Sequence, residues 1–316
     1  MKNILIATHQ RGFESDPIID ELRKKEVNVF RFNFDDGDNV SLCSFSTKKN
    51  EISYTCDTRN ILDNEISVGW CQQLPPYIGY PSNQKEALQR QNIYSLQMAT
   101  LNLLDISWFN KPKNVEFASN KVNQLYFAER FTNLLVPKTL VSNNPNDIRS
   151  FSKNRKIIAK NLSTPWIFDK NKIKAAHTMI VNEKWLLDDE ALSLTPVIYQ
   201  EYCKRAKDFR VIIVGEKVFA AECIPDNNQM EDIRRGSKTG ESFKPCGFNK
   251  EIIKELKVLM NIFSIEYCAA DFMEDEKGNI FFLEVNTCGS WWWMDRFYNG
   301  MIRKSITEEI LKKGWS

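Results

Sequence analysis

The sequence predicts an α/β protein, and three of its segments carry the prediction. Near its start the chain has a continuous apolar run, Asn3–Thr8, and a second strand-like run, Asn28–Asn33, with a helical segment between them. This βαβ arrangement implies a parallel sheet covered by helices. Residues 209–223 and 265–286 each contain two strand-like runs joined by turn residues, which is typical of a hairpin. The chain therefore combines a parallel sheet with hairpins.

The remaining elements of the first third follow from local patterns. A helix is expected over residues 15–25, because Pro17 suits a first helical turn. Residues 40–72 alternate weakly between apolar and polar, which predicts short strands at the edge of the sheet. Residues 82–105 carry apolar side chains at helical spacing and predict a long helix, followed by a short strand at 106–110.

Similar signals predict the elements of the second half. Strands are expected at residues 156–161 and 197–203, and a turn at Gly215 joins the two strands of the first hairpin. A helix is expected at 249–263, and a closing amphipathic helix at 296–313.

The composition of the chain limits the classes of function that it can have. The 316 residues suffice for two or three small domains, and the 43 basic and 41 acidic side chains give no net field that would attract nucleic acid or an anionic membrane. No apolar run is long enough to span a bilayer. Two histidines exclude a multi-histidine metal site, and the eight cysteines have no metal-ligand spacing. We expect reduced thiols in a cytoplasmic protein.

The hairpin at 265–286 carries candidate metal ligands. Phe282, Glu284 and Asn286 are expected on one face of the second strand, because side chains repeat every two residues. The hairpin can bring Asp271 alongside them. Two carboxylates and an amide oxygen suit Mg²⁺ held between protein and substrate phosphates. The alternative is a polar, wet face, but both acidic residues interrupt strongly apolar runs, where an unpaired charge is costly.

These residues also resemble a known family. Asp, then a hairpin, then Glu-x-Asn followed by Gly looks like the metal-binding end of the ATP-grasp superfamily. The segment EVNTCGSWWW is similar to the microviridin-type ligases, which close rings in ribosomal peptides (graspetides). Further matches to the pattern of these ligases are Trp108, Asn110, Asn120, Lys121, Val136 and Pro137.

The resemblance implies a three-part ATP-grasp fold. Residues 1–112 would form an N-terminal pre-ATP-grasp α/β domain with the βαβ unit. Residues 113–195 would form a central subdomain with a hairpin that binds a leader peptide. Residues 196–316 would form the C-terminal ATP-grasp subdomain with the metal site.

The resemblance also implies an ATP site. Lys160 would reach the α- and β-phosphates, and Lys121 would neutralise further phosphate charge. Adenine would lie against a linker and bond with its backbone, at the positions of Glu201, Tyr202 and Cys203. Asp208 follows this linker as a further ATP-binding residue.

Two arginines are the candidate catalytic clamps. A guanidinium group matches a carboxylate or phosphate with two parallel hydrogen bonds. Arg210 and Arg234 each belong to an Asp-x-Arg sequence, and the resemblance implies that they face ATP and the acceptor carboxylate. For an arginine considered without this context, a surface salt bridge is the more common role.

The peptide would bind where other ATP-grasp proteins have a glycine-rich flap. No glycine occurs between Gly79 and Gly215, so such a flap is excluded over this stretch. Graspetide ligases use this region as a hairpin that holds the leader peptide. Four aromatic residues are candidate peptide contacts, although packing is the more common role for the consecutive tryptophans 291–293: Trp166, Phe168, Trp185 and Trp291.

The expected function is that of an ATP-dependent carboxylate ligase. It would use ATP and two Mg²⁺ ions to activate Asp or Glu side chains of a precursor peptide as acyl phosphates. Thr or Ser hydroxyls, or Lys amines, would then close rings as esters or amides. The expected partner is a precursor peptide with a leader and a core. Neither nucleic acid nor a membrane is expected as a partner. Whether the protein forms a homodimer is left open. Two alternatives remain: a ligase that adds free amino acids to a peptide or protein, and an inactive peptide-binding module. The sequence does not identify the peptide, the number of rings or the choice between ester and amide.

Overall fold

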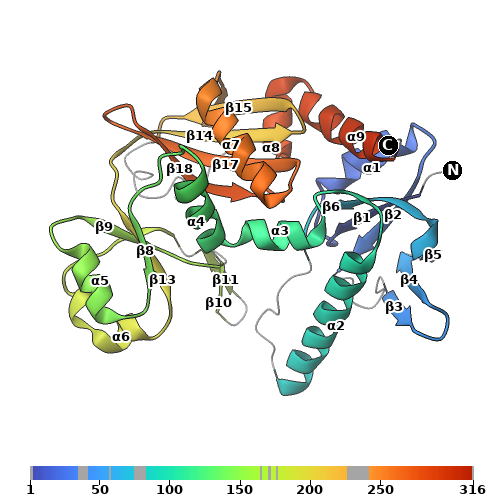
Figure 1. Ribbon diagram of the computed structural model, residues 1–316, viewed down its shortest axis with the longest axis horizontal. Helices are drawn as coiled ribbons and strands as arrows, with labels where there is room; N and C mark the ends of the chain where they lie inside the picture. The colour runs from blue at the N-terminus through green and yellow to red at the C-terminus, as the bar shows by residue number, and fades with distance from the viewer. Residues whose placement is uncertain are drawn as a thin grey trace.

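The computed structural model describes residues 3–34, 42–56, 58–74, 83–163, 166–169, 172–175, 177–225 and 242–314; for 166–169 and 172–175 only the backbone is described. Figure 1 shows an N-terminal sheet at one end of the molecule, a smaller lobe with β8, β9 and β13 at the other, and the C-terminal sheet between them. The α/β prediction is confirmed.

The N-terminal sheet is parallel, with the order β2-β1-β6-β7. Its strands are β1 (Asn3–Thr8), β2 (Asn28–Asn33), β6 (Ile66–Cys71) and β7 (Ser107–Phe109). The prediction that residues 40–72 lie at the sheet's edge is wrong for β6, which pairs with β1 and β7 on its two sides. The reason is burial, because Val68, Gly69, Trp70 and Cys71 are all buried.

Helices and a small antiparallel sheet surround these strands. The helices are α1 (Ser15–Arg23) and the 20-residue α2 (Gln84–Leu103). The small sheet has the order β3-β4-β5, with β3 (Leu42–Ser46), β4 (Glu51–Cys56) and β5 (Arg59–Leu62), followed by the 3-10 turn η1 (Asp63–Glu65). Most of α2 is exposed, and Leu88 and Ile93 of its expected apolar face are 58% and 49% exposed.

The smaller lobe is built on the antiparallel sheet β12-β9-β13-β8. Its strands are β8 (Thr139–Ser142), β9 (Ile157–Lys160), β12 (Met179–Ile180) and β13 (Val197–Glu201). Its helical segments are α5 (Pro145–Ser152), η2 (Trp185–Leu187) and α6 (Asp189–Ser193). A two-stranded hairpin of β10 (Trp166–Asp169) and β11 (Lys172–Ala175) extends from this part of the chain, as the sequence predicts.

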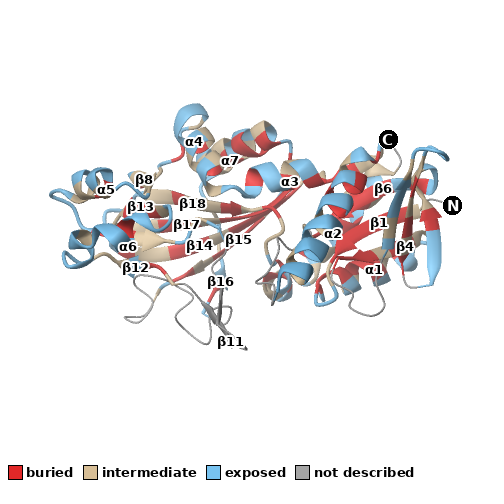
Figure 2. Ribbon diagram, turned by 90° about the horizontal axis from the view of Figure 1, so that it is seen from below, coloured by how far each residue is buried: buried red, intermediate tan, exposed pale blue. Residues whose placement is uncertain are grey.

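The C-terminal sheet has five antiparallel strands in the order β16-β15-β14-β17-β18. They are β14 (Arg205–Val214), β15 (Lys217–Cys223), β16 (Lys244–Pro245), β17 (Tyr267–Asp275) and β18 (Ile280–Asn286). Helices α3 (Pro112–Ser119), α4 (Lys121–Phe131) and α7 (Lys250–Phe263) cover one face. Figure 2 shows buried residues concentrated along the sheets, whereas α4 and α5 expose much of their surface.

The expected helix over residues 296–313 is interrupted. It consists of the short η4 (Arg296–Tyr298) and α9 (Met301–Lys313), preceded by α8 (Trp292–Asp295). Asn299 and Gly300 separate η4 from α9 with φ angles of 50° and 79°, which end a right-handed helix. Asp295 then accepts hydrogen bonds from the first backbone N–H groups of α9.

The first and last parts of the chain share one core. Ile4 and Ile6 of β1 belong to the same buried cluster as Ile212 and Val214 of β14, and α1 and α9 contribute residues to it. Figure 1 shows α1 and α9 next to each other at this junction. The domain boundaries near residues 112 and 195 stay a prediction. No helix in the described ranges has both the length and the apolar character that a membrane span requires.

Candidate functional site

A β-bulge decides which side chains of β18 face the site. Asp271 of β17 pairs with Glu284, but Phe272 pairs with Phe282, so that Leu283 has no opposite residue. The extra residue turns Phe282 to the helix-covered face, where its ring lies 5.7 Å from that of Phe272. The prediction that Phe282 shares a face with Glu284 and Asn286 is therefore wrong. The bulge separates an apolar half of the strand from a polar half.

Three oxygen-bearing side chains meet on the other face. The Asn286 Nδ2 donates to Asp271 Oδ2 at 3.1 Å and to Glu284 Oε1 at 3.3 Å. The amide therefore ties the two carboxylates together and keeps its own Oδ1 as an acceptor. The hairpin brings together the set that the sequence predicts. Its role as a metal site stays a proposal.

Cationic side chains adjoin both carboxylates. Lys121 Nζ, at the start of α4, lies 3.3 Å from Glu284 Oε2, and Arg210 Nε of β14 lies 2.8 Å from Asp271 Oδ1. Burial raises the pKa of Glu284, but the charge of Lys121, the Asn286 hydrogen bond and the charge of Lys160 outweigh it and hold that pKa below its ordinary value. Glu284 is therefore ionised near neutral pH.

The donor set fits Mg²⁺. This ion commonly binds one or two protein carboxylates and completes its octahedron with water and substrate phosphates. Asp271 and Glu284 supply two carboxylates, and Asn286 supplies a neutral oxygen. Across the described residues no three His, Cys, Asp or Glu side chains gather as a metal-holding group. Water and phosphate oxygens would complete the coordination that Asp271, Glu284 and Asn286 begin.

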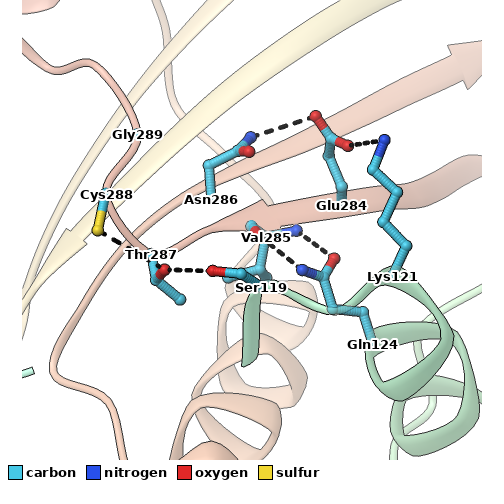
Figure 3. Close-up of a pocket in the computed structure, with 9 residues that line it drawn as sticks. All are labelled: Ser119, Lys121, Gln124, Glu284, Val285, Asn286, Thr287, Cys288 and Gly289. Atoms are coloured by element: carbon cyan, nitrogen blue, oxygen red, sulfur yellow. Dashed lines mark hydrogen bonds and ion pairs between the residues drawn. The ribbon is translucent and has the colours of Figure 1, made fainter. Parts of the chain in front are cut away.

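A small hollow of about 180 Å³ opens beside these residues. Figure 3 shows Lys121, Glu284 and Asn286 on one side of it and Thr287, Cys288 and Gly289 on the other. A Cβ atom at Gly289 would lie 2.6 Å from the Ala269 Cβ and 2.8 Å from the Asn286 Cβ. Glycine thus lets the loop pass directly against Asn286.

Gln124 of α4 fixes the strand that carries Glu284 and Asn286. Its Oε1 accepts from the Val285 N–H at 2.8 Å, and its Nε2 donates to the carbonyl oxygens of Val285 and Ala118, each at 2.7 Å. β18 is the outer strand of its sheet, so these bonds give partners to backbone groups of Val285 that face away from the neighbouring strand. Gln124 was not predicted from the sequence.

We expect Gln124→Leu to destabilise the fold. The side chain is 2% exposed, and leucine leaves the buried polar groups of Val285 without partners, which costs about 1–3 kcal/mol for each group. Urea unfolding measures the loss. The matched control is Gln91→Leu on the exposed face of α2, which should change the free energy of unfolding little. Equal stability of both variants would contradict the role of Gln124.

Asn110 connects the N-terminal sheet to the site. It follows β7 with a φ of 54°, and its Oδ1 accepts from the N–H groups of Glu266 and Tyr267 at 2.8 and 3.1 Å. Its Nδ2 donates to the carbonyl oxygens of Tyr267 at 2.8 Å and Thr287 at 3.3 Å. One side chain thus fixes the start of β17 and the loop after β18.

Glu14 reaches the same loop from the turn between β1 and α1. It is 6% exposed and accepts hydrogen bonds from the Ser290 hydroxyl and the Trp292 N–H. Burial raises the pKa of Glu14 above its ordinary value, although these bonds and the charge of Arg210 oppose the rise. The sequence did not single out Glu14. Its carboxylate lies near enough to Arg210 for their charges to interact.

The chain is similar to known proteins in its structure, not in a sequence family. The sequence matches no protein-family profile and no curated protein. Solved structures do match. A Chryseobacterium gregarium RiPP-associated ATP-grasp ligase, in complex with ADP and a leader and core peptide, has a TM-score of 0.86 and 24% identity over 99% of this chain and 97% of that chain. The Microcystis aeruginosa macrocyclase MdnC, bound with precursor peptide MdnA, has a TM-score of 0.84 and 24% identity over 98% and 99%. The ATP-grasp ligase PsnB, complexed with minimal precursor, has a TM-score of 0.78 and 17% identity over 99% of each chain.

The chain has the ATP-grasp fold. The fold predicted from the sequence is confirmed.

Within the ATP-grasp fold, the predicted ATP-binding lysines lie on facing elements. Lys160 ends β9 and donates to Gln200 Oε1 at 2.8 Å, and its charge acts on Glu284. Lys121 donates to the carbonyl oxygen of Asn161 at 3.4 Å. Both ammonium groups therefore lie close enough to Glu284 to lower its pKa. Their predicted phosphate-binding role stays a prediction.

The predicted adenine linker begins at Glu201, the last residue of β13. The N–H groups of Glu201 and Tyr202 donate to the carbonyl oxygens of Lys138 and Lys156, each at 2.9 Å. An adenine would therefore use linker groups other than these two N–H groups. Burial, with the charges of Glu201 and Asp275, raises the pKa of Cys203 to about 11, so its thiol stays protonated.

Asp208 has a different environment from the one expected of an ATP contact. It is 5% exposed on β14, and Arg205 Nε lies 3.4 Å from its Oδ1. In this conformation Asp208 pairs with a buried arginine rather than facing an open pocket. Its predicted ATP contact stays a prediction.

The residues predicted to contact the peptide differ in their exposure to solvent. Trp291 is 2% exposed and packs in the core shared by the two sheets, whereas Trp292 beside it is 43% exposed. Trp291 therefore has a packing role in this structure, and its predicted contact with a peptide stays a prediction. Trp185 is 40% exposed. The side chains of Trp166 and Phe168, and the whole of Arg234, lie outside the described residues.

Proposed function

We propose that this protein is an ATP-dependent ligase that closes rings in a ribosomally made precursor peptide. The observation that carries the proposal is the Asp271, Glu284 and Asn286 set, with Arg210 and Lys121 on its carboxylates, in a chain with the ATP-grasp fold. Solved structures with this fold include a macrocyclase bound with its precursor peptide and a ligase complexed with Mg, ADP and a precursor variant.

The proposed reaction begins with charge neutralisation. Lys121 and Lys160 would hold phosphate oxygens of ATP, while Asp271, Glu284 and Asn286 would bind magnesium between protein and phosphates. Bound magnesium supplies positive charge to the β- and γ-phosphates. Phosphoryl transfer depends mainly on such positioning and charge stabilisation.

Arginine would then hold the peptide carboxylate. Arg210 Nε already contacts Asp271 Oδ1, and the other nitrogen atoms of its guanidinium group would bind the incoming acidic side chain. A carboxylate oxygen would attack the γ-phosphorus, and ADP would leave. The acyl phosphate would react with a hydroxyl or amine of the same peptide, whose tethering raises its effective concentration. Arg234 stays the proposed second clamp.

A candidate precursor, incubated with the protein, ATP and Mg²⁺, tests this function. Each ring closed removes the mass of one water from the peptide and releases one ADP and one phosphate. Mass spectrometry and an ADP assay follow both quantities. A peptide that gains one amino-acid residue, only when free amino acid is added, would support the amino-acid ligase instead. An unmodified peptide and no ADP would support an inactive binding module.

The leader peptide is proposed to bind around the hairpin β10–β11 and the segment that follows it. Trp185, Leu187 and Leu194 are 40%, 81% and 82% exposed, so this stretch offers apolar side chains on the surface. Exposed apolar residues rimmed by charge suit an amphipathic peptide segment.

We expect Trp185→Ala to weaken binding of the precursor by about tenfold or more, because aromatic anchors dominate peptide interfaces. Nucleotide affinity should stay unchanged. Isothermal titration with peptide and with ATP measures both. Leu103→Ala on α2, which is 61% exposed, is the control for loss of an exposed apolar side chain. Equal peptide affinity of the two variants would move the leader site elsewhere.

A further inference from the structure

Two cysteines from distant parts of the chain lie close to each other beside the proposed metal ligands Glu284 and Asn286. Cys71 ends β6 in the N-terminal sheet, and Cys288 lies in the loop after β18. The Cys288 thiol lies 3.9 Å from the carbonyl oxygen of Cys71, and both side chains pack against the same core cluster. The Cys71 thiol donates to the carbonyl oxygen of Gln73 at 3.3 Å. None of the eight cysteines, all of which lie in the described residues, forms a disulfide in the structure.

The two cysteines differ in their access to solvent. Cys71 is 1% exposed, whereas Cys288 is half-buried and lines the hollow beside Glu284 and Asn286. The neighbouring Cys288 thiol and burial raise the pKa of Cys71 well above its ordinary value. A small oxidant that enters the hollow therefore meets Cys288 first, with Cys71 behind it as the second thiol.

We propose that Cys71 and Cys288 form a reversible disulfide when the protein meets a hydroperoxide. Cys288 first reacts with hydrogen peroxide to give a sulfenic acid and one water. The Cys71 sulfur then attacks the Cys288 sulfur, the S–O bond breaks, and the Cys71 proton leaves with the hydroxyl group as a second water. Two thiols and one peroxide thus give one disulfide and two waters. A dithiol reductant reverses the reaction.

The cross-link would disturb the metal residues. A disulfide has an S–S distance of about 2.05 Å, so the Cys288 sulfur must move away from the Cys71 carbonyl oxygen and toward the Cys71 sulfur. The loop has little room to adapt, because Gly289 already packs against Asn286 and Ala269. A movement of Cys288 is thereby passed to Asn286. A misplacement of about 1 Å reduces turnover by on the order of 10²-fold. This consequence, unlike the disulfide itself, rests on the proposed ligase function.

Peptide mapping tests the bond without any assay of function. The full-length protein is treated with hydrogen peroxide, its remaining thiols are alkylated under denaturing conditions, and the digest is analysed before and after reduction. We expect one linked pair of peptides, containing Cys71 and Cys288, that separates on reduction. Cys288 found as an alkylated thiol, or as a sulfinic acid beside an alkylated Cys71, would overturn the proposal.

Two variants sharpen the test. In Cys71→Ala the second thiol is absent, so Cys288 should be trapped by dimedone as a sulfenic acid, whereas the linked wild-type protein gives no adduct. Cys246→Ala, which removes another half-buried thiol, should still form the link. Absence of the dimedone adduct in Cys71→Ala would contradict Cys288 as the first site of attack.

The effect of the disulfide on turnover is measured separately, as the rate of ADP release in the presence of a precursor peptide. Oxidised wild-type protein should lose turnover by on the order of 10²-fold and regain it on reduction. A mapped disulfide with unchanged turnover would refute the claim that the disulfide controls the proposed ligase site. A reduced protein that never turns over would refute the ligase function, while the mapped disulfide would stand.

Discussion

Glu284→Gln should reduce ADP formation by about 10²-fold or more, the largest effect expected of any single change. Removing metal-borne charge stabilisation costs several kcal/mol in the transition state, and each 1.36 kcal/mol is about tenfold in rate. Glutamine keeps the size of the side chain and an oxygen but removes the charge that Lys121 and Asn286 now contact. ADP release in the presence of precursor, at saturating Mg²⁺, measures the loss.

The control comes from the same hairpin. Glu276→Gln removes an exposed carboxylate that pairs with Lys204 at 2.5 Å, with a side chain 54% exposed, and should leave turnover unchanged. Thermal unfolding of both variants shows whether they are folded. Near-normal turnover by folded Glu284→Gln would remove this hairpin from the catalytic site.

Arg210→Lys should have the second-largest effect, reducing turnover by on the order of 10²-fold while nucleotide affinity changes little. Lysine retains a positive charge near Asp271, but a point charge does not reproduce the two parallel hydrogen bonds of a guanidinium group. Loss of turnover with unchanged ATP affinity is the signature of a clamp on the acceptor carboxylate. Steady-state turnover and ATP titration measure the two quantities.

Arg149→Lys provides the comparison, because Arg149 pairs with Asp189 on the exposed side of the smaller lobe, at 2.5 Å. This exchange should change neither quantity. If Arg210→Lys behaved in the same way, Arg210 would be an ordinary ion-pair partner of Asp271.

The sequence predicted that Asp271, Glu284 and Asn286 come together, because the pattern that places them is local. Asp271 interrupts an apolar strand, and Glu284 and Asn286 stand two residues apart, so the strand period alone places the latter two together. The β-bulge was not predictable in this way. One extra residue, Leu283, moves Phe282 to the opposite face, and only the pairing with β17 reveals it.

Other features depended on contacts between distant residues. Gln124 bonds with a residue 161 positions away, and Glu14 with one 276 positions away, and no pattern around either residue shows its partner. The burial of Trp291 beside the exposed Trp292 likewise follows from packing between the two sheets. By contrast, the pair Asn299-Gly300 is a turn signal that the sequence contains, and it should have divided the predicted closing helix.

The central claim is that this site activates a peptide carboxylate as an acyl phosphate, and oxygen-18 tests it most directly. The Asp and Glu side chains of a precursor are labelled with oxygen-18, and the peptide is incubated with protein, ATP and Mg²⁺ in unlabelled water. In the proposed reaction the attacking carboxylate oxygen stays on phosphorus when the hydroxyl or amine displaces phosphate. The account predicts one labelled oxygen in each phosphate released, with one label lost from the peptide for every ring closed. Unlabelled phosphate, with every label retained in a modified peptide, would contradict it.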